Sequence, residues 1–108
     1  MTLAPAAAVS LSMVFHELAT NSAKYGALSA PGGRIALAWT ISPDALVLQW
    51  TERGGPRPKE QTRRGFGSRL LQSVVVRELG GELHQRLAPE GLECRIRLPL
   101  SSRVLAAG

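Results

Sequence analysis

The architecture of this chain follows from one segment, HELATNSAKYGA, at residues 16–27. Its pattern predicts most of a helix that ends at a glycine, Gly26. Residues three or four apart share one face of a helix. Projected at about 100° per residue, one arc of roughly 140° carries only polar side chains, those of His16, Glu17, Thr20, Asn21 and Lys24. The opposite side is expected to face a core, because it carries Leu11, Val14, Phe15, Leu18, Ser22 and Tyr25.

The polar face combines groups that suit a phosphate-bound metal ion. The carboxamide oxygen of Asn21 is a ligand type that Mg²⁺ accepts alongside waters and phosphate oxygens. Lys24, one turn later, can neutralise phosphate charge, and Glu17, one turn earlier, can accept a proton or orient a water. The other interpretation is an ordinary amphipathic helix with a solvated polar face, so the rest of the chain has to decide.

Length and composition restrict the class of protein. The 108 residues suffice for one domain, 1–108, and 44% hydrophobic residues indicate a globular chain. No apolar run approaches the roughly 20 residues of a membrane helix, and no signal peptide is evident, so we expect no direct membrane contact. The single cysteine, Cys94, excludes an internal disulfide and favours a reducing compartment, the cytoplasm.

The charge of the chain suggests a polyanionic partner. The net charge is +5, with eleven arginines among the thirteen basic residues. Nucleotide phosphates, nucleic acid and an acidic protein surface would all satisfy it. Few aromatic residues interleave with the arginines, so we expect no nucleic acid partner.

The remaining pattern alternates hairpins with helices. Apolar periodicity predicts helices at 8–25 and 65–79, and strict alternation predicts strands at 34–41, 45–51, 82–87 and 92–98. Residues 56–64 contain almost nothing apolar and are expected to form a mobile loop, residues 1–7 a frayed entry, and residues 101–108 a loose tail. This order predicts an α+β fold, a two-layer sandwich with a mostly antiparallel sheet covered on one face by helices.

Two glycine-bearing turns flank the polar loop. Gly54 and Gly55 end a strand, whereas Gly65 and Gly67 begin a helix, where free N–H groups can bind phosphate. A turn glycine followed by a helix entry explains them equally well. No Gly-Lys-Ser/Thr follows, so the segment is not a P-loop, and the βαβ context of a dinucleotide fingerprint is missing.

In this order the segments resemble the ATP-binding catalytic domain of sensor histidine kinases, in the superfamily of gyrase, Hsp90 and MutL. HELATN with KYGA (16–21 and 24–27) resembles the N box, ERGGP (52–56) stands where the G1 box belongs, and GFGSRL (65–70) resembles the G2 box. The histidine of the N box and the Trp-x-Glu of residues 50–52 resemble the HWE subfamily. The resemblance covers about residues 8–100.

The resemblance implies a Bergerat ATP-binding fold and a role for each matching residue. Asn21 would coordinate Mg²⁺ on the ATP phosphates, and Glu17 would organise metal water or the incoming nucleophile as the catalytic group near the γ-phosphate. Glu52 would accept a hydrogen bond from the adenine amino group. The other residues implied in ATP binding are Lys24, Tyr25, Gly54, Arg63, Arg64, Gly65, Gly67 and Ser68.

Four further residues are interpreted individually. His16 either orients Glu17 as a second catalytic residue or makes a local hydrogen bond on the helix surface. Trp50 is expected in the core beneath the pocket, His84 on the surface of its strand, and Cys94 among buried apolar side chains.

The chain departs from the family in two ways. It carries no phosphoacceptor module, so the resemblance implies a phosphoacceptor and dimerisation domain of the same kinase, followed by a response regulator, as partners. Related domains carry a further helix and strand before the N box, so the shortened front would leave a sheet edge open and favour a homodimer or poor order. The alternatives are a stand-alone serine kinase of this fold and a nucleotide-gated docking module.

Overall fold

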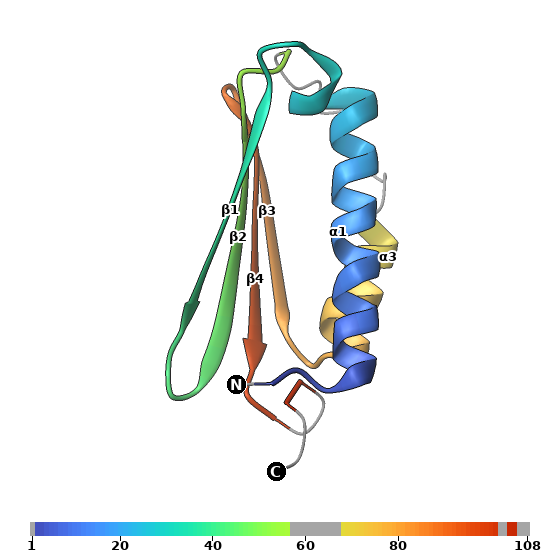
Figure 1. The fold of residues 1–108 in the computed structure, drawn as a ribbon, viewed down its shortest axis with the longest axis vertical. Helices are drawn as coiled ribbons and strands as arrows, with labels where there is room; N and C mark the ends of the chain where they lie inside the picture. The colour runs from blue at the N-terminus through green and yellow to red at the C-terminus, as the bar shows by residue number, and fades with distance from the viewer. Residues whose placement is uncertain (1, 57–67, 102–103, 106–108) are drawn as a thin grey trace.

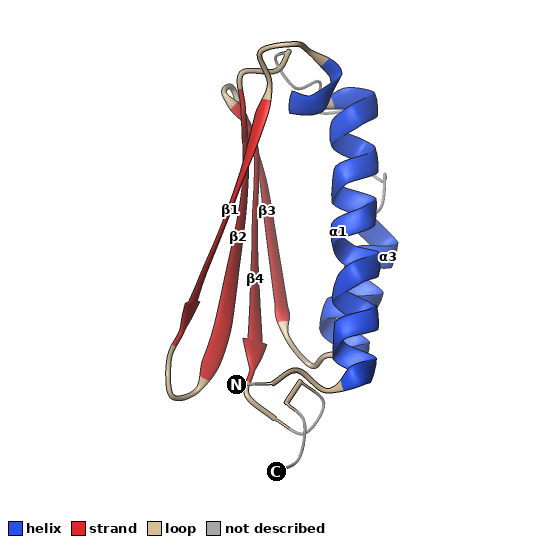
Figure 2. Cartoon of the chain, in the orientation of Figure 1, coloured by secondary structure: helices blue, strands red, loops and turns tan. Residues whose placement is uncertain are grey.

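The computed structural model describes residues 2–56, 68–101 and 104–105. A sheet of four antiparallel strands forms one layer, and the helices form a second layer on one of its faces (Figures 1 and 2). The elements are, in chain order, α1 (Pro5–Tyr25), the 3₁₀ turn η1 (Ala27–Ser29), β1 (Arg34–Ile41), β2 (Ala45–Arg53), α3 (Ser68–Gln72), the π-helical turn η2 (Ser73–Glu78), β3 (Glu82–Ala88) and β4 (Gly91–Pro99). The predicted two-layer α+β fold is confirmed.

Helix α1 is longer at its start than the sequence pattern predicts. It begins at Pro5, whose fixed φ and missing N–H suit the first helical position. Ala7 is fully buried, so the prediction of a frayed entry over residues 1–7 is wrong at this position. The helix ends before Gly26 as predicted, and Gly26 caps it with φ −117°, outside the left-handed region that many glycine caps adopt. Its N–H donates to the carbonyl of Ser22 at 2.9 Å.

The strand order is β1-β2-β4-β3, so both hairpins contribute to one sheet and β2 pairs with β4 at its centre. The register sets Trp50 opposite Leu37 on β1 and opposite Cys94 on β4. Because side chains alternate along a strand, one face of the central strands is apolar and faces α1.

The core lies between this face and the helices. Its buried members are Ala7, Leu11, Val14 and Leu18 of α1, Leu46, Leu48 and Trp50 of β2, Leu71, Val74, Val75 and Leu79 of the second helix, Leu92, Cys94, Ile96 and Leu98 of β4, and Val104. The burial predicted for Trp50 and Cys94 is therefore confirmed, and His84 is exposed on β3 as predicted.

The apolar side of β1 is only partly covered. Leu37, Trp39 and Ile41 are 40%, 62% and 55% exposed, and they line an open groove with Leu3, Leu11, Phe15, Leu46 and Leu48. Strand β1 is also an edge strand of the sheet. The described chain therefore presents a sheet edge with exposed apolar residues at β1.

The second helix changes its winding along its length. Leu79 N–H donates to the carbonyl of Val74, five residues earlier, at 3.0 Å, so the last turn is wider than an α-helical turn. The chain then reverses at Gly80, which adopts φ +69°, a conformation that favours glycine.

Residues 104–105 are not the loose tail that the sequence predicts. Leu3 forms a bridge with Leu105, and Ala4 N–H donates to the carbonyl of Val104 at 2.8 Å. The Val104 side chain is fully buried. The prediction of a loose tail is therefore wrong at residues 104–105, which seal the core beside the start of α1.

Candidate functional site

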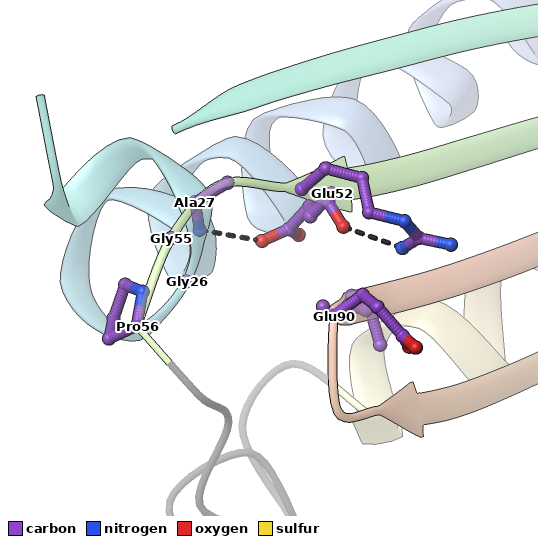
Figure 3. A pocket seen from close by; sticks show the side chains of 9 residues that line it. Gly26, Ala27, Glu52, Gly55, Pro56 and Glu90 are labelled. Atoms are coloured by element: carbon purple, nitrogen blue, oxygen red, sulfur yellow. Dashed lines mark hydrogen bonds between the residues drawn. The ribbon is translucent and has the colours of Figure 1, made fainter. Parts of the chain in front are cut away.

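The end of β2 nearest the C-terminus of α1 carries a buried acidic side chain, Glu52. It is only 1% exposed, and its carboxylate accepts hydrogen bonds from α1, η1 and β2. Ser22 Oγ and Ala27 N–H donate to Oε1, each at 3.0 Å, and Trp50 Nε1–H donates to Oε2 at 2.9 Å. Figure 3 shows the carboxylate pointing to the backbone of Ala27. These donors stabilise a buried carboxylate that would otherwise be costly to remove from water.

Two elements supply these donors. Trp50 and Glu52 are two residues apart on β2 and therefore lie on the same face of the strand. Ser22 lies in the last turn of α1, and Ala27 begins the short turn η1 directly after it. The carboxylate thus joins the end of the helix to the end of the central strand.

Glycines allow the backbone to close around this carboxylate. A Cβ on Gly91 would lie 2.0 Å from the Glu52 carbonyl oxygen, and a Cβ on Gly55 would lie 2.5 Å from the Ala27 Cα. Gly54 adopts φ +78°, where a side chain would be strained, and its own Cβ would meet the Gly32 carbonyl at 2.4 Å. Close backbone packing, rather than a turn alone, therefore requires these glycines.

A small hollow lies beside Glu52. Its volume is about 10 Å³, and it is lined by Gly26, Ala27, Glu52, Arg53, Gly55, Pro56, Glu90, Gly91 and Leu92. This volume holds about one water molecule. A nucleotide that contacts Glu52 must therefore occupy space beyond this hollow.

The five polar residues that the helix projection places on one face of α1 differ in how far they are buried. Asn21 is only 7% exposed and makes an interaction of its own, whereas His16 and Lys24 are exposed. Glu17 is half-buried, one turn before Asn21. Thr20 Oγ donates to the carbonyl of His16 at 2.8 Å, so this hydroxyl is engaged by its own helix. Asn21 and Glu17 remain the members of this face that combine a polar group with partial burial.

The predicted phosphate-binding residues cannot all be placed. Arg63, Arg64, Gly65 and Gly67 lie outside the described residues, and of Ser68 only its position at the start of α3 is described. Tyr25 is half-buried at the end of α1 and has an interaction partner within the chain. A second, larger cavity of about 610 Å³ borders the second helix and is lined by Arg69, Gln72, Ser73, Val76 and Arg77.

A charged network that the sequence pattern did not predict lies on the opposite face of β2. The Arg53 guanidinium donates to the Glu52 carbonyl at 2.7 Å and to the Glu93 carboxylate on β4 at 2.5 Å. This hydrogen bond and the charge of Arg53 lower the pKa of Glu93, and Arg86 adds to the effect. Opposite charges on the outward positions of β2 and β4 were the available signal, but the strand pairing was needed to interpret it.

The Glu52 charge also acts on a neighbouring thiol. Burial, and then the charge of Glu52, raise the pKa of the Cys94 thiol to about 12. Cys94 is fully buried on β4 and faces Trp50 across the strand pair. This thiol therefore stays protonated at neutral pH and behaves as a small apolar side chain.

The described residues carry no ready-made metal cage. Among them, no three His, Cys, Asp or Glu side chains gather closely enough to hold a metal ion. A magnesium ion held mainly by phosphates and water needs only one or two protein ligands, and the buried Asn21 carboxamide has the right chemistry for one.

In the part of the chain that the structure describes, no helix is long and apolar enough to span a membrane.

Comparison with known proteins finds similar sequences among histidine kinases. No family model matches the chain. The chain is 41% identical over 100 residues to the blue-light-activated histidine kinases of Brucella anthropi and Brucella ovis, a match that covers 89% of this chain and 20% of each relative. The chain thus spans about a fifth of the length of these relatives.

Solved structures agree in fold. The histidine kinase domain of a blue-light activated histidine kinase from Erythrobacter litoralis superimposes with a TM-score of 0.74 at 21% identity, over 91% of this chain and 50% of that one. The catalytic domain of the histidine kinase ThkA gives a TM-score of 0.65 at 16% identity, over 84% and 65% of the two chains. The chain is thus similar in sequence to a segment of named histidine kinases, and it shares the fold of solved histidine kinase domains.

Proposed function

We propose that this chain binds Mg·ATP and donates the γ-phosphate to a histidine on a separate phosphoacceptor domain, within a two-component signalling system. The observation that carries the proposal is the buried Glu52 carboxylate, held at the end of β2 next to the helix that bears Asn21. The 41% identity to named histidine kinases supports the same reaction class.

The residues would divide the task as follows. Glu52 accepts a hydrogen bond from the adenine amino group. Asn21 is a ligand of Mg²⁺, which neutralises charge on the phosphates when it is bound. Lys24, exposed one turn later, contacts phosphate, and Glu17 orients a metal water or the attacking imidazole. Phosphoryl transfer needs mainly such positioning and charge stabilisation.

The remaining contacts complete the proposed site. Tyr25 and Gly54 border the nucleotide, and the phosphates are held by Arg63, Arg64, Gly65, Gly67 and Ser68. His16 next to Glu17 and the Trp50–Glu52 pair support membership of the HWE subfamily. The partners are then a phosphoacceptor and dimerisation domain and a response regulator, in the cytoplasm.

Calorimetry tests the nucleotide site. Titration of ATP into the purified chain should show micromolar to sub-millimolar binding that weakens at least about tenfold when Mg²⁺ is omitted or when Asn21 is replaced by alanine. Ser12→Ala, an exposed position on α1, is the matched control and should bind as the wild type does. A folded wild-type chain that binds no ATP would refute the proposal.

Labelling tests the reaction. The chain is incubated with γ-labelled ATP and a phosphoacceptor domain of a related histidine kinase. The proposal predicts label on the acceptor that is lost in acid and retained in alkali, as a phosphohistidine requires. Acid-stable label would instead indicate a serine kinase.

A further inference from the structure

Trp50, Ala27 and Ser22 all act as hydrogen-bond donors to the Glu52 carboxylate. The indole N–H of Trp50 and the backbone N–H of Ala27 have no acceptor function. The Ser22 hydroxyl could act either way, but its oxygen already accepts the N–H of Leu28 at 3.1 Å, and its proton goes to Glu52. All three contacts therefore use the carboxylate as an acceptor.

The same contacts fix the orientation of the carboxylate plane. A glutamate side chain has three rotatable torsions, and an unrestrained one would sample several rotamers. Here Oε2 is held from β2 itself, through Trp50, and Oε1 is held from the end of α1, through Ser22. Restraints on both oxygens from two different elements leave one orientation.

Packing in turn fixes the indole. The Trp50 ring stacks on Phe15 of α1, with ring centroids 6.3 Å apart and an angle of 16° between the planes. Trp50 is only 6% exposed, so its N–H has no ready access to water as an alternative partner. This rigidity favours a role in directing Glu52 over a role in the core alone.

We propose that Trp50 and Ser22 are positioning residues that hold Glu52 as a fixed acceptor. Held in this way, Glu52 makes the site select a base with an amino group over a base with a carbonyl at the same place. The inference rests on the proposed function, because it assumes that Glu52 meets the nucleobase. A carbonyl oxygen at the same place would set one acceptor against another, and the restrained carboxylate could not turn away. A site built around one hydrogen bond rejects the analogue that lacks its partner.

The test compares two nucleotides that differ in the amino group alone. ATP and purine ribonucleoside triphosphate, which lacks that group, are titrated with Mg²⁺ into the wild type, Trp50→Phe and Ser22→Ala, and GTP is titrated as the carbonyl-bearing base. Trp50→Phe keeps an aromatic ring against Phe15 but removes the N–H. Trp39→Phe on β1, where the tryptophan is 62% exposed, is the control.

The wild type and Trp39→Phe should bind ATP at least about tenfold more tightly than the purine analogue and GTP, as expected for a hydrogen bond to a charged group. In Trp50→Phe and Ser22→Ala, the ATP affinity should fall to within about threefold of the analogue, while the affinity for the analogue stays within about twofold of the wild-type value. A purely structural role would weaken the binding of both nucleotides alike.

The outcomes separate the two proposals. If the wild type prefers ATP and both variants keep that preference, the positioning role is overturned and the proposed function stands. If the folded wild type binds no nucleotide, the proposed function fails and the inference fails with it. Circular dichroism verifies that each variant is folded, and if Trp50→Phe is not, the result for Ser22→Ala decides.

Discussion

Two adjacent glycines should respond very unequally to the same substitution. Gly32 and Gly33 precede β1 and lie against the turn that follows α1. A Cβ on Gly33 would lie 1.5 Å from the carbonyl oxygen of Ala27 and 2.4 Å from its carbonyl carbon. The nearest neighbour of a Cβ on Gly32 is the Gly54 carbonyl oxygen, at 3.8 Å, which is an ordinary contact.

The expected magnitude follows from these distances. In Gly33→Ala, the Ala27 peptide must move by about 2 Å to restore van der Waals contact. Overpacking of this kind costs about 1–3 kcal/mol. The same movement pulls the Ala27 N–H away from Glu52 Oε1, and the loss of a hydrogen bond to a charged group costs about 1.5–3 kcal/mol more. We expect Gly33→Ala to lower the free energy of unfolding by about 2.5–6 kcal/mol and Gly32→Ala to change it by less than about 1 kcal/mol.

Urea denaturation followed by tryptophan fluorescence measures both variants. Total stabilities of domains are about 5–15 kcal/mol, so Gly33→Ala should unfold at a clearly lower urea concentration or fail to fold. Equal midpoints for Gly33→Ala and the wild type would refute the reasoning, because Ala27 could then move without cost and its N–H would not be a fixed partner of Glu52. A large loss of stability in Gly32→Ala would contradict it as well.

Three further perturbations have defined outcomes. Burial and the Glu52 charge raise the pKa of Cys94 from 9.0 to about 12, so the contribution of the protonated thiol to stability is complete below about pH 9 and is lost as the pH rises towards 12. Thiol labelling at pH 8 should proceed only as fast as the chain unfolds, and rapid labelling of the folded chain would contradict this. Because Arg53 lowers the pKa of Glu93 below 4.5, the contribution of this pair to stability is present above that pH and is lost as the pH falls through the lower folded-state value. Glu93→Gln should therefore reduce the loss of stability at acid pH, measured by urea denaturation at several pH values, and an unchanged pH dependence would show that the pair does not stabilise the fold. Val104→Ala should destabilise the chain by about 1–2 kcal/mol in thermal unfolding, whereas Val9→Ala, at a position 62% exposed on α1, should change little; equal effects would mean that the tail does not seal the core.

Local patterns were sufficient to predict the elements of the fold. Strict alternation located the four strands, and glycines marked the ends of both helices. Two short segments were misjudged: Ala7 and Val104 are buried in the core, and the two ends of the chain meet where Ala4 N–H bonds the carbonyl of Val104. Such contact has no signature in either segment alone.

The sequence predicted which residues belong to the candidate site, but not the hydrogen bonds that join them. Glu52 and Asn21 were identified from their motifs, and Ser22 was assigned correctly to the core side of α1. The hydrogen bonds from Ser22 and Ala27 to Glu52 could not be foreseen, because they join residues 25 or more positions apart and one donor is a backbone N–H. The Trp-x-Glu spacing did indicate that Trp50 and Glu52 lie together, since side chains two residues apart on a strand point to the same face.

The central claim is that this chain binds Mg·ATP with its base against Glu52 and its metal at Asn21. A crystal structure of the chain with Mg²⁺ and a non-hydrolysable ATP analogue tests it most directly. The account predicts the adenine amino nitrogen within hydrogen-bond distance of the Glu52 carboxylate and the Asn21 carboxamide oxygen among the ligands of the metal. A nucleotide bound elsewhere, for example in the cavity between Arg69 and Arg77 along the second helix, would contradict it.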